Sequence, residues 1–378
     1  MSNLYTNEDP GSSRRGFLKK SAAGSMAALS LKDLLSIPSV GGPAPVKPDH
    51  VIRAVPENLV WGYFGADVPP VARIKDGDVA AIDTISTVGI PQKDPEVFFK
   101  SQNLPIDAHA REIIDALQKV PLEPSGIRGH MLTGPIYIEG AEPGDSLEVR
   151  IMDLPIRSTY GINAVRVGGG GLPDEVKTSE TFVYRYDKRK STASTVDGVD
   201  IPLRPFMGVM ALSPPPEKGR VSSIPPDFFG GNLDIKHLTK GTTIYLPVSV
   251  PGGLFTVGDC HTAQGNGEVS GTAIEASLAL VGKFIVHKGK TLKQVRAETP
   301  THFIAIGLDP DLRLAMKNAL MEAVKFISEE LGFTFNQALS IASTGVDFEV
   351  SQVVDRTLGV HAMIPKSIFT KKKFAYWS

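Results

Sequence analysis

Glycine and proline are so frequent in this chain that they exclude a mainly helical fold. The 378 residues include 37 Gly and 29 Pro, about 17% of the sequence. Glycine is costly inside a helix, and proline removes a backbone donor and breaks the helix. The content therefore favours a β-rich fold with many turns. Because 42% of the residues are hydrophobic, a chain of this length can bury the core of one or two domains.

Strand patterns come first along the chain. Residues 79–87 and 146–152 alternate between apolar and polar side chains, as a half-buried strand does, and 242–250 and 283–287 are further strand candidates. Turn signals precede the first two strands at Gly77-Asp78 and Pro143-Gly144-Asp145.

Helix patterns gather near the C-terminus. A short helix is predicted over 108–117, with Asp107 as its N-cap. The strongest helix pattern spans 309–331, with Pro310 in the first turn, an apolar stripe that includes Leu312 and Met316, and Gly332 at the end. A second C-terminal helix is predicted over 336–343. This separation of strands from helices predicts an α+β fold with a C-terminal helix pair.

Charge and cysteine content exclude several kinds of protein. The formal net charge is −1, so no basic footprint for nucleic acid is expected. The run Lys371-Lys372-Lys373 is interpreted as a solvated tail. The single cysteine, Cys260, excludes an internal disulfide framework and a cysteine-rich zinc cluster.

The N-terminus resembles an export signal. Residues 13–19 contain the pair Arg14-Arg15 ahead of Phe17 and Leu18, as in twin-arginine signals, and a weakly apolar run follows at 22–31. That run is too short to span a bilayer as a stable helix, and a basic amphipathic helix is the alternative. The resemblance implies recognition by the twin-arginine export machinery and a periplasmic or secreted protein of bacterial type. We assign residues 1–50 to signal and Pro/Gly-rich linker, and 51–378 to one catalytic domain.

Four acidic or imidazole side chains lie within 17 positions between residues 259 and 275: Asp259, His261, Glu268 and Glu275. Asp259 and His261 are two residues apart, so on a strand both point to the same face. A carboxylate beside an imidazole is half of a plausible divalent-metal site. The alternative is a polar loop between strands, but the glycines interspersed with these acids favour a ligand site.

The same segment resembles the acetamidase/formamidase family, which carries a similar Gly-Asp-x-His-x-x-Gln-Gly-Asp-Gly-Glu-Val block. Segments 130–145, 230–238, 246–255 and 360–365 also resemble family signatures, so the similarity runs from about residue 51 to residue 366. One position departs from the pattern, because Asn266 stands where the family usually has Asp. The resemblance implies a β-rich layered (β/α/β) fold with antiparallel sheets, and hydrolysis of a small linear amide such as formamide or acetamide.

Four residues are candidate metal ligands: Asp259, His261, His130 and Asp234. His130 and Asp234 would come from other segments, since neighbours in sequence cannot surround an ion alone. Either could instead be structural, Asp234 as a cap for the residues that follow it, and His237 belongs to the same undecided group. Zinc is expected from the ligand types, with calcium as a candidate second ion.

Amide hydrolysis needs a polarised carbonyl, a strong nucleophile and a proton for the leaving amine. Glu268 is the candidate proton shuttle, Glu142 is a second catalytic candidate that could equally be a surface turn residue, and Glu275 is assigned a supporting role. Gln264, Gly265 and Gly267 are the candidate substrate-binding residues, because glycine-rich turns can present backbone N–H groups to an oxyanion.

Other interpretations of the chain remain open. Cys260 could be a nucleophile, but on a strand it would point away from Asp259 and His261, so a buried apolar role is expected. No Gly-x-Ser-x-Gly elbow is present, and the glycines at 168–171 predict a loop that could act as a lid. The rival function is an exported protein that binds a small molecule or metal without catalysis. A homo-oligomer, specifically a dimer, is expected.

Overall fold

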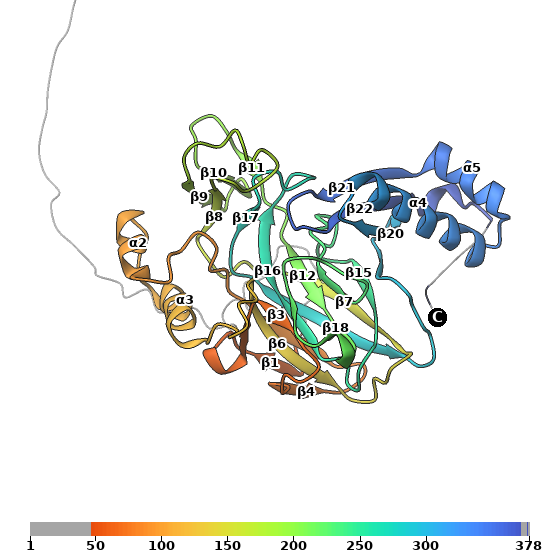
Figure 1. The fold of residues 1–378 in the computed structure, drawn as a ribbon, viewed down its shortest axis with the longest axis horizontal. Coiled ribbons are helices and arrows are strands. Elements are labelled where there is room, and N and C mark those ends of the chain that lie inside the picture. The colour runs from red at the N-terminus through yellow and green to blue at the C-terminus, as the bar shows by residue number, and fades with distance from the viewer. Residues whose placement is uncertain (1–46, 372–375, 377–378) are drawn as a thin grey trace, which may run out of the picture.

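The structure, a computed structural model, describes residues 47–371 and 376. Two large sheets pack face to face, with helices at both ends of the molecule (Figure 1). The first sheet has nine strands in the order β1 His50–Ile52, β5 Val79–Asp83, β18 Ala279–His287, β7 Ser146–Asp153, β15 Thr243–Pro247, β19 Arg296–Glu298, β20 His302–Asp309, β22 Leu358–Pro365 and β21 Asp347–Gln352. Neighbours in this sheet are antiparallel except β1 and β5.

The second sheet has eleven strands and is built around β16, Phe255–Ala263. One edge of β16 pairs with β12, and the other pairs with β6 and then β17. The remaining strands are β11 Ile201–Pro202, β10 Thr192–Ser194, β9 Glu180–Asp187, β8 Tyr160–Val165, β17 Ile274–Glu275, β12 Phe206–Ala211, β14 Gly230–Asn232, β6 Met131–Ile138, β2 Leu59–Trp61 and β4 Ala72–Ile74. A separate ribbon joins β3 Tyr63–Phe64 to β13 Val221–Ser222, and short 3-10 turns lie at Pro56–Asn58, Pro216–Lys218 and Lys366–Ile368.

The main core fills the space between the two sheets. Phe255 of β16 meets Phe284 of β18 edge to face, with ring centroids 5.1 Å apart, and both side chains are fully buried. Apolar residues of β7 and β15 complete this core from the first sheet, and those of β6 and β12 from the second. Burial of β16 between other strands and this core holds its backbone rigidly, which matters because β16 carries the candidate site residues.

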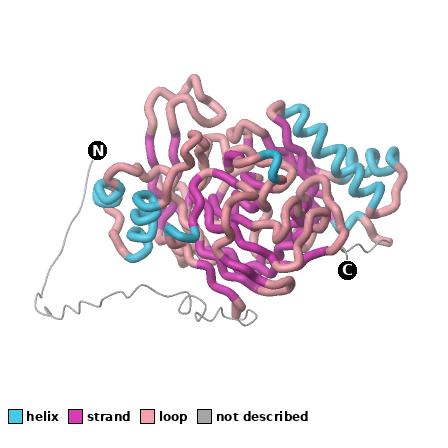
Figure 2. Tube along the Cα trace, turned by 60° about the horizontal axis from the view of Figure 1, so that its bottom comes forward, coloured by secondary structure: helices cyan, strands magenta, loops and turns pink. Residues whose placement is uncertain are grey.

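Helices cover the ends of the sheets instead of the interface between them (Figure 2). α2 Pro95–Ser101 and α3 Ala108–Lys119 pack near β8, and α4 Leu312–Glu329 and α5 Phe335–Gly345 pack on β20 and β22. Within residues 47–371, no helix is long and apolar enough to cross a membrane.

The α+β class, the antiparallel sheets and the C-terminal helix pair are confirmed. All four predicted strands exist, and Asp107 caps α3 by accepting a hydrogen bond from the backbone N–H of Ala110 at 2.9 Å. α2 was missed, although Pro95 in its first turn is a start signal.

The apolar stripe predicted for the long C-terminal helix is only partly right. α4 begins after its N-cap Asp311, so Pro310 lies outside it, and Leu312 and Met316 are 38% and 37% exposed. The buried face carries Val324 and Ile327 of the predicted stripe together with alanines, among them Ala319. The reason is close packing: a Cβ on Gly307 of β20 would lie 2.0 Å from the backbone nitrogen of Ala319, so only small residues fit between helix and strand.

Candidate active site

β16 brings Asp259 and His261 side by side, as their two-residue spacing predicts. His261 is fully buried, and the ring of Phe206 from β12 contacts its imidazole edge to face at 5.0 Å. Its Nδ1 atom lies 2.9 Å from Oε1 of Gln264, whose amide group donates to the carbonyl oxygens of Asp234 at 3.0 Å and Ser351 at 3.2 Å. Gln264 therefore orients the imidazole so that Nε2 faces the acidic side chains.

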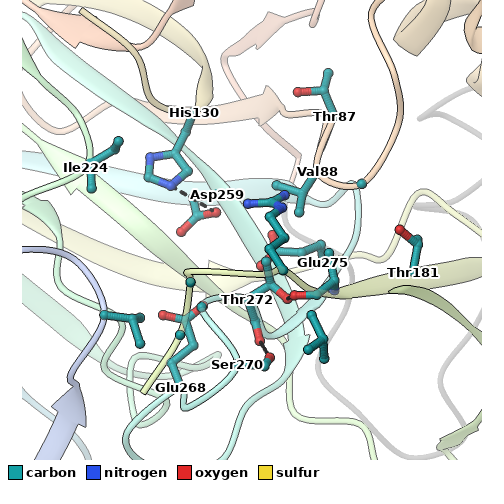
Figure 3. A pocket seen from close by; sticks show the side chains of 18 of the residues that line it. Thr87, Val88, His130, Thr181, Ile224, Asp259, Glu268, Ser270, Thr272 and Glu275 are labelled. Carbon is teal, nitrogen blue, oxygen red and sulfur yellow. Dashed lines mark hydrogen bonds and ion pairs between the residues drawn. The ribbon is translucent and has the colours of Figure 1, made fainter. Parts of the chain in front are cut away.

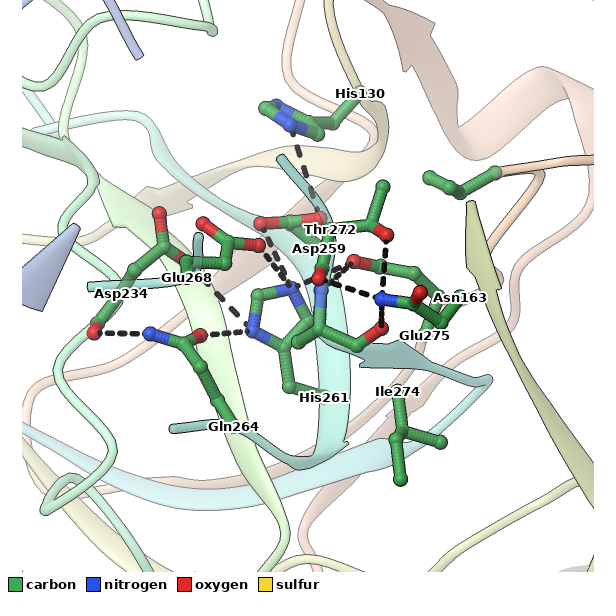
Figure 4. Close-up of polar contacts among 12 residues, drawn as sticks. His130, Asn163, Asp234, Asp259, His261, Gln264, Glu268, Thr272, Ile274 and Glu275 are labelled. Atoms are coloured by element: carbon green, nitrogen blue, oxygen red, sulfur yellow. Dashed lines mark hydrogen bonds and ion pairs between the residues drawn. The ribbon is translucent and has the colours of Figure 1, made fainter. Parts of the chain in front are cut away.

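Three carboxylates surround His261 Nε2 (Figure 4). Glu275 Oε1 lies 3.2 Å away, Asp259 Oδ2 3.3 Å and Glu268 Oε1 3.9 Å. Asp234 lies on the other side of the ring, with Oδ1 3.7 Å from Nδ1. His130, immediately before β6, places Nε2 3.7 Å from the second oxygen of Asp259, and its Nδ1 contacts the Ser223 hydroxyl at 3.1 Å. All four predicted ligands therefore lie in one cluster, together with Glu268.

Three of these acids have unusual backbone conformations. Asp234, Asp259 and Glu268 have φ angles of 49°, 51° and 45°, in the left-handed region that residues other than glycine rarely adopt. Such strain persists only where the surrounding structure imposes it, and it is concentrated at functional sites. All three side chains are buried in the cluster despite this backbone cost.

Asp355 joins the cluster and was not predicted from the sequence. It follows β21 in a bend, is only 8% exposed, and lines the same cavity as Asp259 and Glu268. Burial raises its pKa to about 7, and the negative charge of Asp259 adds to this effect. No local pattern marks Asp355 as functional, because its place depends on the path of the chain from β21 to β22.

The cluster has more negative charge than its own residues can neutralise. Burial raises the pKa of Asp234, Glu268 and Glu275, and neighbouring carboxylates raise them further. Burial would also raise the pKa of Asp259, but the charges of His130 and His261 lower it below its usual range. For His261, burial opposes protonation, yet Glu275 and Asp259 raise its pKa well above the usual value.

These residues fit a divalent cation. Among the described residues, buried polar atoms without a hydrogen-bond partner include Asp234 Oδ1 and Oδ2, His261 Nε2, Glu275 Oε2 and Asp355 Oδ2. Ligand bonds of about 2.0–2.2 Å in tetrahedral geometry separate neighbouring donor atoms by roughly 3.3 Å. His261 Nε2 lies at that spacing from both Asp259 and Glu275. Either Asp259, His261 and Glu275, or Asp234, His261 and Glu268, could hold an ion.

A cavity of about 930 Å³ reaches this cluster (Figure 3). His130, Asp259, Glu268, Glu275 and Asp355 line its floor, and the walls include Trp61, Val88 and Ile224. The predicted glycine loop lies beside it: Gly170 lines the cavity, and the Gly171 N–H donates to the Val269 carbonyl at 2.8 Å. A ligand entering the cavity therefore meets the carboxylate cluster directly.

The structure does not bring every predicted residue to this cavity. Glu142 is exposed in the turn between β6 and β7, where its backbone N–H bonds to Asp145, and it does not line the cavity. Gln264 and Gly265 line a different pocket, while Gly267 is buried and pairs with Gln352. The turn at 264–267 packs behind His261 against the end of β21, so Gln264 contacts the histidine and not the cavity.

Cys260 occupies the opposite face of β16. It is fully buried in the main core, and its sulfur lies 2.6 Å from the Thr84 hydroxyl. Burial raises the pKa of the thiol to about 12, so it is protonated at neutral pH. This placement argues against a thiol nucleophile.

Known proteins resemble this chain over most of its length. The profile of the Acetamidase/Formamidase family matches residues 55–218 and 216–371. A formamidase of Methylophilus methylotrophus is 29% identical over 299 residues, which covers 60% of this chain and 73% of that protein. An acetamidase of Mycolicibacterium smegmatis is 27% identical over 297 residues, covering 57% of this chain and 73% of that protein.

A solved structure shares the fold. The crystal structure of an acetamidase from Bacillus halodurans has a TM-score of 0.70 and 26% sequence identity, covering 85% of this chain and 99% of that one. The sequence match spans nearly all of the described residues, including every residue of the carboxylate cluster. The chain belongs to the Acetamidase/Formamidase family.

Proposed function

We propose that this protein hydrolyses a small linear amide to a carboxylate and ammonia at the carboxylate cluster, with a divalent cation held there. Family membership makes it an amidohydrolase acting on small linear amides, and relatives named formamidase and acetamidase support this activity. The observation that carries the cation is the spacing of His261 Nε2 from Asp259 and Glu275, 3.3 Å and 3.2 Å, among buried acids of which several oxygens lack a hydrogen-bond partner.

We assign the ion to Asp259, His261 and Glu275, with His130 and Asp234 completing the charge around it. When bound, a divalent ion of the zinc type would polarise the amide carbonyl and lower the pKa of a water molecule toward neutrality. Gln264 fixes the tautomer that leaves His261 Nε2 free as a ligand, because its Oε1 accepts from the Nδ1–H.

Glu268 is the group that we propose to move the proton. It lines the cavity but lies farther from His261 Nε2, at 3.9 Å, than Asp259 or Glu275 does. Burial, as the first cause, raises the pKa of Glu268, which favours a carboxyl group that can carry a proton to the leaving amine. Asp355, with a pKa of about 7, stands at the same cavity and can exchange protons with it.

Ammonia release from formamide and acetamide, measured with and without a chelator, tests the proposal. Loss of ammonia release on chelation and its return on adding zinc are expected. His261→Ala should lose bound metal and activity together while circular dichroism shows a folded protein. Amide binding without ammonia release by the metal-loaded protein would instead favour the non-catalytic binding function. Full metal content in His261→Ala would remove this histidine from the ion.

Export and assembly also remain proposals. We propose that the protein leaves the cytoplasm through the twin-arginine machinery, on the strength of Arg14 and Arg15, which lie outside the described residues. The domain boundary proposed near residue 50 is supported by the family match, which begins at residue 55. A homodimer is supported by the exposed Leu312, Met316 and Phe335 on the helix pair, since association would cover them.

A further inference from the structure

A second cluster of metal-binding side chains lies outside the carboxylate cluster. Glu349 of β21 and His361 of β22 are directly opposite each other across the two strands. His237, in the segment after β14, places Nε2 2.9 Å from Glu349 Oε2, and His361 Nε2 lies 3.8 Å from the same oxygen. The three ligand atoms all lie within 4.8 Å of one another.

His361 is the observation that points to a ligand. Its side chain is fully buried, and Nε2 has no hydrogen-bond partner among the described residues. The other ring nitrogen lies 2.7 Å from the hydroxyl of Ser351, which is also buried. Such a contact fixes the ring and leaves Nε2 directed at Glu349. A second-layer partner of this kind is typical of histidines that bind metal.

Two neighbouring side chains, those of Asn266 and Arg204, affect how a cation could bind to these three residues. The Asn266 side-chain amide donates to Glu349 Oε2. The guanidinium of Arg204 lies 3.2 Å from His237 Nδ1, so a bound cation requires this exposed side chain to turn away. A cavity of about 360 Å³ lies beside the cluster and is lined by His237, Glu349 and Arg204, which provides a path for an ion.

We propose that His237, Glu349 and His361 form a second metal site, for a divalent first-row transition ion. Two imidazoles and one carboxylate on one side of an ion, with open positions facing a cavity, suit zinc, cobalt or iron(II) and not calcium. The site is independent of the proposed amide hydrolysis. It ties β21 and β22 to the segment after β14 that carries His237.

Cobalt(II) binding to the chelator-treated full-length protein tests the site. In a His261→Ala background, which removes the ion of the carboxylate cluster, one equivalent of cobalt should remain, with visible absorption and a rise in melting temperature. Adding His237→Gln to the His261→Ala background should abolish the binding of that one equivalent of cobalt. Glu349→Gln is a second variant at a half-buried position, in case His237→Gln perturbs folding. The matched control is His302→Gln, because His302 lines the same cavity but lies outside the cluster; it should bind like the background.

Two further variants should change the affinity for cobalt in opposite directions. Ser351→Ala removes the hydroxyl behind His361 and should weaken cobalt binding by about 10–100-fold. Asn266→Asp adds a carboxylate beside Glu349 and should tighten it. Unchanged cobalt stoichiometry and affinity in both His237→Gln and Glu349→Gln would overturn the proposal, as would the absence of any remaining equivalent in His261→Ala. Neither outcome would bear on amide hydrolysis, which is assayed separately by ammonia release.

Discussion

Gly208 of β12 offers the sharpest test of the carboxylate cluster. A Cβ built at this position would lie 2.4 Å from Oδ2 of Asp259 and 2.5 Å from Oδ1 of Asp234. Ordinary contacts begin at 3.4 Å, so Gly208→Ala forces each carboxylate to move by about 1 Å. The backbone of Gly208 is not left-handed, so the demand that alanine adds is steric; its Cβ would also lie 2.9 Å from the backbone carbonyl oxygen of Asp259.

The expected loss is large in activity and modest in stability. A displacement of about 1 Å at a catalytic group costs on the order of 10²-fold in rate. The free energy of unfolding should fall by about 1–3 kcal/mol, the usual cost of one extra methyl group in a packed interior. The assay is ammonia release from acetamide, alongside elemental analysis for metal and thermal unfolding followed by circular dichroism.

Gly282→Ala is the matched control, because it is also a buried strand glycine. Its Cβ would meet Phe284, Val149 and Leu280 at 3.4–3.6 Å, in ordinary contact. This variant should keep both metal and activity. If Gly208→Ala retains full metal content and the parental rate, then Asp234 and Asp259 do not act together on an ion, and the assignment of the cluster is wrong.

Other predictions follow from the same geometry. Glu268→Gln should lower the rate of amide hydrolysis by roughly 10²–10⁴ with metal content intact, which is the usual contribution of a proton-transfer group. The rate of Cys260→Ser should stay within a few-fold of the parent rate. The opposite result, with both variants folded, would favour a thiol acyl-enzyme. Because burial raises the pKa of Asp355 from 3.8 to about 7, its protonated form stabilises the metal-free protein at acid pH, and this stabilisation is lost as pH rises through about 7. The melting temperature of the chelator-treated protein should therefore fall as pH rises from 3.8 to about 7, and it should fall less in Asp355→Asn. An equal dependence of melting temperature on pH in the two proteins would contradict the raised pKa of Asp355. Replacing Arg14 and Arg15 by lysine should leave the protein in the cytoplasm, as fractionation and immunoblotting would show, and unchanged export would argue against the twin-arginine signal.

Local sequence patterns were sufficient to predict several strands and helices of this protein and one pair of its site residues. Alternation placed strands such as β7, the two-residue spacing placed Asp259 beside His261, and Asp107 marked the start of α3. Each of these features depends on residues only a few positions apart, where backbone geometry alone decides which side chains share a face. The glycine and proline content likewise excluded a helical bundle without any tertiary information.

The composition of the site was decided only by the tertiary structure. Glu268 and Asp355 line one cavity because the turn after β16 and the bend after β21 converge there, and Asp234 from the segment after β14 is buried beside them next to His261. Glu142 has the same chemistry but stays in an exposed turn. A carboxylate becomes part of an ion site through burial beside other carboxylates and a histidine. That depends on contacts between distant segments, which local periodicity does not encode.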